Sequence, residues 1–188
     1  MRAATADRFE DVAALLAPCR ADAPACWCLT YRLTNAENST LRGSDRPRRL
    51  QELCSREPPP GVVAYMDGTP VGWCSFGPRS ELARLARSRT IPRLDEVPVW
   101  SVYCLMVRAG YRGRGLASHL LDGVVTLARS RGVPALEAYP VDPQGQRISA
   151  SQAFVGTTSL FERAGFTRVA PTASTSGGLR RWVMRLDL

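Results

Sequence analysis

The 188-residue chain contains no lysine, so all 25 of its basic residues are arginines. No lysine of the chain can therefore be a substrate for modification. Arginine binds phosphates and carboxylates through a planar fork of donors, so the net charge of +8 is compatible with an anionic cofactor, an acidic substrate or a nucleic acid. Base composition of the coding DNA is the alternative explanation for most of these arginines. The chain also lacks a dense basic run with interleaved aromatics, which argues against a nucleic-acid partner.

The chain has a single histidine, and it lacks zinc-type cysteine spacing and long apolar runs. His119 is the single histidine, and Cys26 and Cys28 flank one tryptophan. Zinc sites typically place two to four residues between paired cysteines and add a second pair or histidines, so we expect no metal. We expect the cysteines to be reduced, mostly buried thiols, which are typical of cytoplasmic proteins. No apolar run approaches the roughly 18 residues that cross a bilayer, so we expect a soluble cytoplasmic protein without a membrane partner.

The length and ordinary composition predict one domain over residues 1–188, with an extended loop at about 77–98. After a short first strand, apolar spacing predicts helices at 7–17, 48–55, 81–88, 116–132 and 157–165. Alternating patterns predict strands at 62–66, 71–76, 97–107, 134–139, 166–170 and 180–188. Asp67 and Gly68 predict a tight hairpin turn, because glycine adopts the positive φ that such turns need.

The strand at 97–107 is apolar on both faces, with Val99, Tyr103, Leu105 and Val107 expected on one of them. A strand of this kind is covered on both sides, as in the centre of a sheet. It leads into "YRGRGLASHL" at 111–120, where glycines and arginines precede a helix. The first turn of a helix has free N–H groups and partial positive charge, so this turn predicts a phosphate or pyrophosphate site. A surface turn rich in Gly and Arg is the alternative.

The strand, the pattern Arg112-x-x-Gly115-x-Ala117 and the helix that follows resemble the GNAT family of N-acetyltransferases. The segment "LFERAGF" at 160–166 extends the resemblance, which covers about 62–188. It implies an α/β (α+β) fold with a mixed, mostly antiparallel central sheet flanked by helices. It also implies an acetyl-CoA-dependent N-acetyltransferase, without a metal, that transfers an acetyl group directly to a primary amine of a small molecule or peptide.

The resemblance also implies where acetyl-CoA binds. Backbone N–H groups of the Gly/Arg turn would hold its pyrophosphate, and the backbone of the preceding strand would pair with its pantetheine arm. The implied cofactor-binding residues are Leu105, Met106, Val107, Arg112, Gly113, Arg114, Gly115, Leu116, Ala117, Ser118 and Phe161. A backbone N–H near Met106 would polarise the thioester carbonyl.

Two positions depart from the family pattern and leave the general acid unassigned. The family often has Tyr, which protonates the departing thiolate, where this chain has Phe161, and Asn where it has Phe154. Core packing is the simpler interpretation of both phenylalanines. Glu137 is the first candidate for the base, although an outward-facing strand carboxylate is the alternative.

Tyr139, Ser159 and Tyr103 are the candidates for the missing acid. His119 lies one turn into a helix, so we expect a surface or phosphate-side histidine. Trp27, Tyr31, Trp73, Trp100 and Tyr103 would either wall the pocket for the acceptor amine or belong to the core. The chief rival function is a non-catalytic acyl-CoA-binding or regulatory domain. The sequence does not decide between a monomer and a homodimer.

Overall fold

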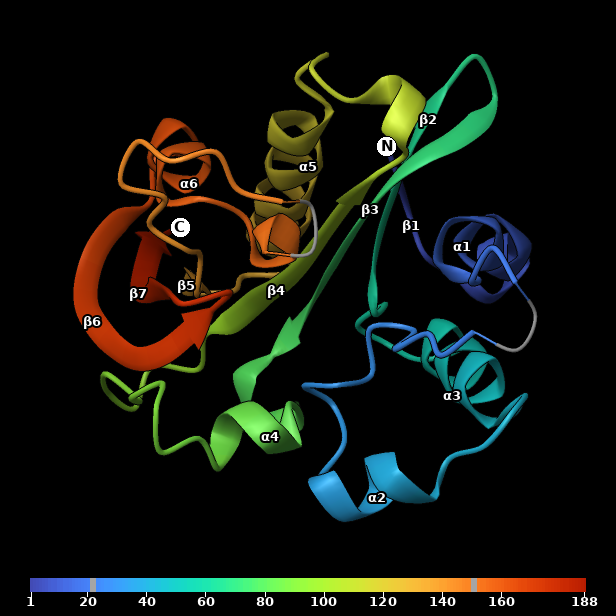
Figure 1. Cartoon of the computed structure of the whole chain (residues 1–188), viewed down its shortest axis with the longest axis horizontal. Coiled ribbons are helices and arrows are strands. Elements are labelled where there is room, and N and C mark those ends of the chain that lie inside the picture. Colours follow the sequence, from blue (N-terminus) through green and yellow to red (C-terminus); the bar gives the residue numbers. More distant parts are fainter. Residues whose placement is uncertain (21–22, 150–151) are drawn as a thin grey trace.

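The computed structural model describes residues 1–20, 23–149 and 152–188. In this part of the chain one sheet has the strand order β1-β2-β3-β4-β5-β7-β6 (Figure 1). The pair β4 and β5 is parallel and the other neighbouring pairs are antiparallel. The strands are β1 Arg2–Ala3, β2 Gly61–Met66, β3 Thr69–Pro78, β4 Trp100–Val107, β5 Ala135–Ala138, β6 Thr167–Ser176 and β7 Leu179–Asp187. The expected mixed, mostly antiparallel sheet is confirmed.

Helices cover both faces of this sheet. They are α1 Phe9–Leu16, α2 Asn35–Thr40, α3 Asp45–Cys54, α4 Ala83–Ala86, α5 Leu116–Ser130 and α6 Thr158–Arg163. On one face, α5 buries the stripe of Leu120, Leu121 and Val124 in a cluster that also holds residues of α6. Each such side chain contributes about 1.5–3 kcal/mol by its burial. Residues of α1, α3 and α4 form the cluster on the other face.

Local signals account for most of these elements. Asp67 and Gly68 have φ of 50° and 77°, as a two-residue hairpin turn requires. The sequence analysis missed α2, which begins with a capping box in which Thr34 and Glu37 satisfy each other's backbone N–H groups. It also ended the strand after α6 too early, because β6 continues to Ser176.

Strand β4 contains a bulge that moves Tyr103 to the other face. Val102 and Cys104 both have partners on β3, whereas Tyr103 between them has none. Tyr103 and Cys104 consequently both pack with the α1 side, while Leu105 and Val107 pack with the α5 side. The prediction that Tyr103 shares a face with Leu105 and Val107 is therefore wrong, because strict alternation does not continue through an extra residue.

The six cysteines are free thiols; Cys28, Cys54 and Cys74 are buried, Cys104 is half-buried, and Cys19 and Cys26 are exposed. Among the described residues, no group of three or more His, Cys, Asp or Glu side chains has an arrangement that could hold a metal ion. Within the same residues, no helix combines the length and the apolar character needed to cross a membrane.

Candidate active site

A cavity opens where β4 separates from β5. Pairing between the two strands covers Trp100, Ser101 and Val102, so the edge of β4 is free of β5 over 103–107. A cavity of about 620 Å³ lies along this edge, and we call it the β4 cavity. Its lining includes Trp27, Cys104, Leu105, Met106, Val107, Arg112, Ala117, Phe154, Gly156, Thr157 and Leu160. Free backbone groups on the edge can pair with an extended ligand as a further strand would.

The Gly/Arg turn beside this cavity has the geometry of an anion cradle. Gly113 and Gly115 have φ of +75° and +74°, and a Cβ at either position would meet no atom within 4 Å. Gly115 is the N-cap of α5 and has no side chain that could cap the first turn of this helix. The N–H groups of Leu116 and the next two residues consequently lie at an open, positively polarised helix end, which fits a pyrophosphate.

The two arginines of the turn are exposed and lie differently. The Nε atom of Arg112 donates to the carbonyl oxygen of Val107 at 3.1 Å, so its side chain folds against the end of β4 and lines the cavity. The guanidinium of Arg114 stacks over the Tyr111 ring at 5.7 Å. Both charges flank the cradle without filling it.

A second cavity, of about 520 Å³, meets the first at a group of thiols. Cys26, Cys28, Cys104 and Phe154 line both cavities. The Cys28 thiol donates to the sulfur of Cys104 at 3.2 Å. This hydrogen bond, together with burial, raises the pKa of Cys28 well above its ordinary value, so the thiol stays protonated and is a poor nucleophile.

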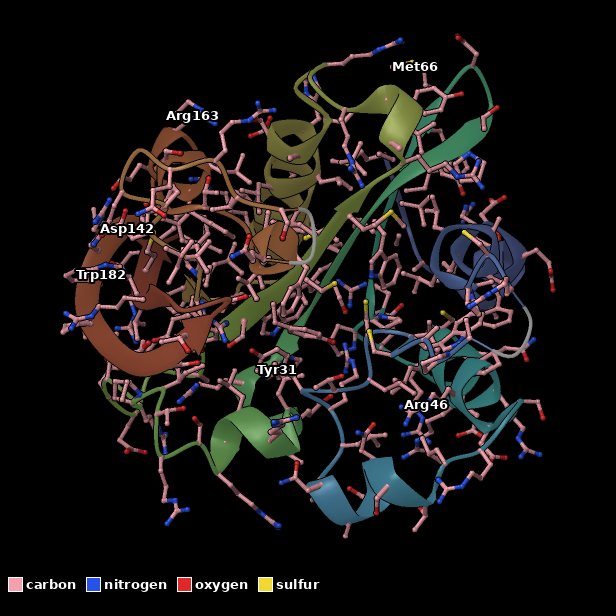
Figure 2. All side chains as sticks on the ribbon, in the orientation of Figure 1. Tyr31, Arg46, Met66, Asp142, Arg163 and Trp182 are labelled. Carbon is pink, nitrogen blue, oxygen red and sulfur yellow. The ribbon has the colours of Figure 1, made fainter. Side chains whose placement is uncertain are left out.

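We call this second space the Arg181 cavity, after a buried guanidinium in its wall. Arg181 is 4% exposed; its Nε atom donates to the Tyr139 carbonyl at 2.7 Å. Its Nη1 atom donates to the hydroxyl of Tyr31 at 2.7 Å and to Ser174 Oγ at 3.3 Å. The carbonyl of Tyr31 in turn accepts from the Arg84 N–H at 3.1 Å, which ties it to α4. Figure 2 shows Tyr31 close to α4. Sequence reasoning missed Arg181 because arginine in an alternating strand normally faces water.

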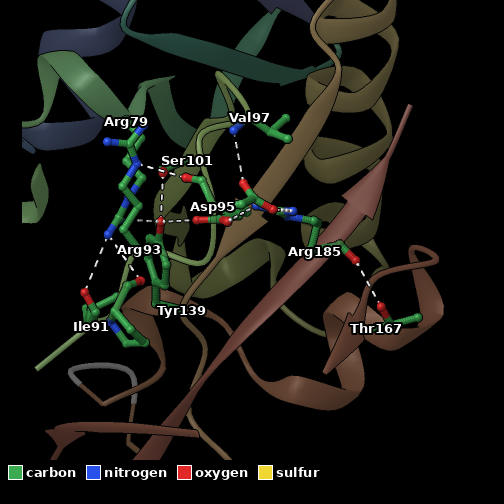
Figure 3. A network of polar contacts seen from close by, with 11 residues as sticks. Arg79, Ile91, Arg93, Asp95, Val97, Ser101, Tyr139, Thr167 and Arg185 are labelled. Carbon is green, nitrogen blue, oxygen red and sulfur yellow. Dashed lines mark hydrogen bonds and ion pairs between the residues drawn. The ribbon is translucent and has the colours of Figure 1, made fainter. Parts of the chain in front are cut away.

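The predicted base Glu137 and its neighbour Tyr139 belong to a buried network of polar contacts rather than to a cavity wall. Figure 3 shows Tyr139 in this network together with Arg79, Ser101 and Arg185. Glu137 is 1% exposed, and its carboxylate accepts from Arg185 Nη2 at 2.7 Å and from the Tyr139 hydroxyl at 2.9 Å. The Tyr139 hydroxyl also accepts from Arg79 Nη1 at 3.0 Å, and it lies 2.9 Å from the hydroxyl oxygen of Ser101. Burial, followed by the charge of Glu137, raises the pKa of Tyr139 above its ordinary range. Neither Glu137 nor Tyr139 lines either cavity.

The remaining predicted side chains divide between cavity and core. Tyr31 and Tyr103 line the Arg181 cavity, and their rings are 5.5 Å apart. Trp73 is fully buried, and its Nε1 donates to Cys28 at 3.2 Å. Phe161 is also fully buried, with its ring edge-on to Phe166 at 5.1 Å.

Three further residues lie outside both cavity walls. Trp100 stacks on Phe76 at 5.5 Å. Ser159 is exposed, with its hydroxyl 3.2 Å from that of Thr157. His119 is an exposed surface residue of α5 with Asp122 at 3.8 Å. The structure therefore brings together the turn, the β4 edge, Trp27, Tyr31 and Tyr103, but not Glu137, Tyr139, Ser159, Trp73 or Phe161.

Comparisons with known proteins agree with this architecture. The family model described as "Acetyltransferase (GNAT) family" matches residues 27–166, so the chain belongs to the GNAT acetyltransferase family, whose members transfer acyl groups. This match begins well before the region in which the sequence resemblance was evident.

Solved structures show the same fold. Ribosomal-protein-alanine N-acetyltransferase from Brucella melitensis is 24% identical, with a TM-score of 0.57, over 100% of this chain and 98% of that chain. Polyamine N-acetyltransferase from Drosophila melanogaster is 18% identical, with a TM-score of 0.59, over 100% and 98% of the two chains. An N-acetyltransferase from Staphylococcus aureus Mu50 is 18% identical, with a TM-score of 0.57, over 99% and 96%. No curated protein sequence matches significantly.

Proposed function

We propose that the protein is an acetyl-CoA-dependent N-acetyltransferase that transfers the acetyl group directly to a primary amine of a small molecule or peptide. The observation that supports this most is the meeting of two cavities at Cys28 and Cys104, one leading to the anion cradle and the other to Arg181. Two substrates that enter from different sides would then meet at the bulge of β4.

The β4 cavity would hold the donor. Backbone N–H groups of 113–118 bind the pyrophosphate, with Arg112 and Arg114 adding charge, and the free edge at Leu105, Met106 and Val107 orients the pantetheine arm. When bound, acetyl-CoA supplies an acetyl group activated as a thioester. The protein then has to orient the amine and exclude water from the junction.

The Arg181 cavity would hold the acceptor amine. None of the described residues that line either cavity is Asp, Glu or His, so the ammonium form of the acceptor loses a proton to water or to a tyrosine phenolate. The neutral amine then attacks the thioester, CoA leaves as the thiolate, and the N–H proton released by the attack passes to that thiolate. Burial raises the pKa of Tyr103 to about 12, and its hydroxyl lies 2.7 Å from Ser75 Oγ in the core. We therefore propose Tyr31, whose oxygen accepts from Arg181, as the group that exchanges a proton with the acceptor. Glu137 as the base stays a prediction.

A non-catalytic acyl-CoA-binding domain is the second candidate. It is favoured by one observation: where the family often has Tyr, Phe161 is packed in the core and provides no proton.

Two measurements separate these functions. The first is the melting temperature with millimolar acetyl-CoA, which should rise for both functions because the ligand binds the folded state. The second is thiol release from acetyl-CoA across amines, aminoglycosides, polyamines and peptides. Release that depends on an amine supports the enzyme, whereas a raised melting temperature without release supports the binding domain.

A further inference from the structure

The wall of the Arg181 cavity carries positive charge that no described lining residue balances. Arg181 and Arg84 both line the cavity, and none of the described lining residues is acidic. Hydroxyl groups also line the cavity, among them those of Tyr31, Ser174 and Ser176. These groups suit an oxyanion, because hydroxyls and guanidinium groups donate hydrogen bonds to it.

The Arg181 guanidinium is buried, and among residues 1–20, 23–149 and 152–188 no acid forms an ion pair with it. Its hydrogen bonds go to neutral oxygens, namely the Tyr139 carbonyl and the hydroxyls of Tyr31 and Ser174. Its Nη2 atom is buried and has no hydrogen-bond partner in the described part of the chain. An unpaired buried charge is costly, so a ligand that brings a negative charge beside it gains binding free energy.

The acids Asp142, Asp95 and Glu137 pair with other arginines, and Asp142 accepts from Arg168 Nη1 at 2.8 Å. Arg185 Nη2 donates to Asp95 at 3.0 Å and to Glu137 at 2.7 Å. Glu137 also accepts from Tyr139, whose hydroxyl is held by Arg79 at 3.0 Å. The positive charge of Arg181 is therefore available to an anionic ligand in the cavity.

From these contacts we propose that the acceptor is an amine that also carries an oxyanion, a carboxylate or a phosphate, which binds beside Arg181. The inference rests on the proposed function, since it names the class of amine that the same site takes. Polyamines and aminoglycosides should be poor acceptors, because a second cationic group would lie against the Arg181 guanidinium.

The test compares acceptors that differ only in the anion. Thiol release is measured for amino acids and short peptides as free acids and as carboxamides, for 6-aminohexanoate and its amide, for O-phosphoethanolamine and ethanolamine, and for spermidine. We expect the best acceptor to be an anionic member, with kcat/KM about tenfold or more above its neutral partner. The carboxylate and phosphate pairs show which oxyanion is preferred. A neutral amine or spermidine as the best acceptor would overturn the inference.

Substitutions at Arg181 test whether this side chain is responsible for the preference for acids over amides. Arg181→Met should bring kcat/KM for the acid down to that for the amide, and Arg181→Lys should keep part of the difference because the charge remains. Arg180→Met is the matched control, since Arg180 is exposed in the same strand and should leave the ratio unchanged. An acid-to-amide ratio that survives Arg181→Met in folded protein would contradict the assignment, because a purely structural arginine would not set that ratio.

A binding measurement keeps the inference testable if no amine is acetylated. With saturating CoA, the melting temperature is measured with each acid and each amide at equal concentration. Stabilisation by acids alone, lost in Arg181→Met but kept in Arg180→Met, supports the anion site even though the proposed function has failed. Equal shifts with acids and amides would refute the anion site.

Discussion

The Nη1 atom of Arg181 lies 2.7 Å from the hydroxyl of Tyr31, which is 150 residues away in the sequence. This contact joins β7 to the segment before α2 and forms one wall of the Arg181 cavity. Arg181 is also anchored to the Tyr139 carbonyl at the end of β5. The Arg181 cavity is therefore built by segments that lie far apart in the chain.

Gly115→Glu should lower CoA affinity about 100-fold or more, because the new carboxylate fills the open cradle and repels the pyrophosphate. Gly132→Glu is the matched control at the other end of α5, with φ of +64° and open space around it. Both variants carry a similar strain of about 1–2 kcal/mol, but only the first should lose CoA in a titration. Arg114→Ala should lower CoA affinity by only about threefold, because an exposed charge contributes little. Equal losses at Gly115 and Gly132 would mean that the turn is not the phosphate site.

The Cys28 thiol at the junction should not carry the acetyl group. The raised pKa of Cys28 leaves little thiolate at neutral pH, so direct transfer is expected rather than an acyl-cysteine intermediate. The double variant Cys28→Ala with Cys104→Ala should keep turnover within about threefold, and intact mass after incubation with acetyl-CoA alone should show no adduct. An acetyl adduct that forms on either thiol and then decays when amine is added would favour a covalent mechanism.

Glu137→Gln should chiefly lower stability. The substitution removes the charge that pairs with Arg185 in the interior, and breaking such a pair costs about 3 kcal/mol. Denaturant unfolding measures this loss, and turnover is measured at a temperature where the variant is folded. A fall in turnover of roughly 10²-fold with unchanged stability would instead support Glu137 as the base.

Asp95 should make stability depend on pH in acid. Its hydrogen bond from Arg185 holds the pKa of Asp95 below its ordinary value of 3.8. A lowered folded-state pKa stabilises the protein above about 3.8, and this stabilisation is lost as the pH falls through the folded value. Melting temperatures of the parent protein and Asp95→Asn should therefore converge below pH 3.8 and differ most above it. Parallel curves at every pH would remove Asp95 from this account.

The sequence predicted the elements whose signals are local. The α5 stripe, the Asp67 and Gly68 turn and the Gly/Arg turn depend on spacing, positive φ and helix ends, and each is present in the structure. The bulge at Tyr103 was not predictable, because it depends on how β4 pairs with β3.

The candidate site was less predictable than the fold for a similar reason. The Gly/Arg turn and the β4 edge are contiguous in sequence. The residues that line the Arg181 cavity come instead from α4, β4, β7 and the segment that precedes α2. Glu137 was proposed as a base from its place in a strand, but Arg185 and Tyr139 occupy its oxygens in the fold. No spacing rule connects these residues before the chain is folded.

We propose that the acetyl group passes from acetyl-CoA to an amine at the junction of the two cavities. Mass spectrometry of reactions that contain isotope-labelled acetyl-CoA, the protein and the panel of amines tests this transfer. We expect labelled N-acetyl product in proportion to released thiol, with product lost in Gly115→Glu and kept in Gly132→Glu. Thiol release without N-acetyl product, or equal product from both glycine variants, would contradict it.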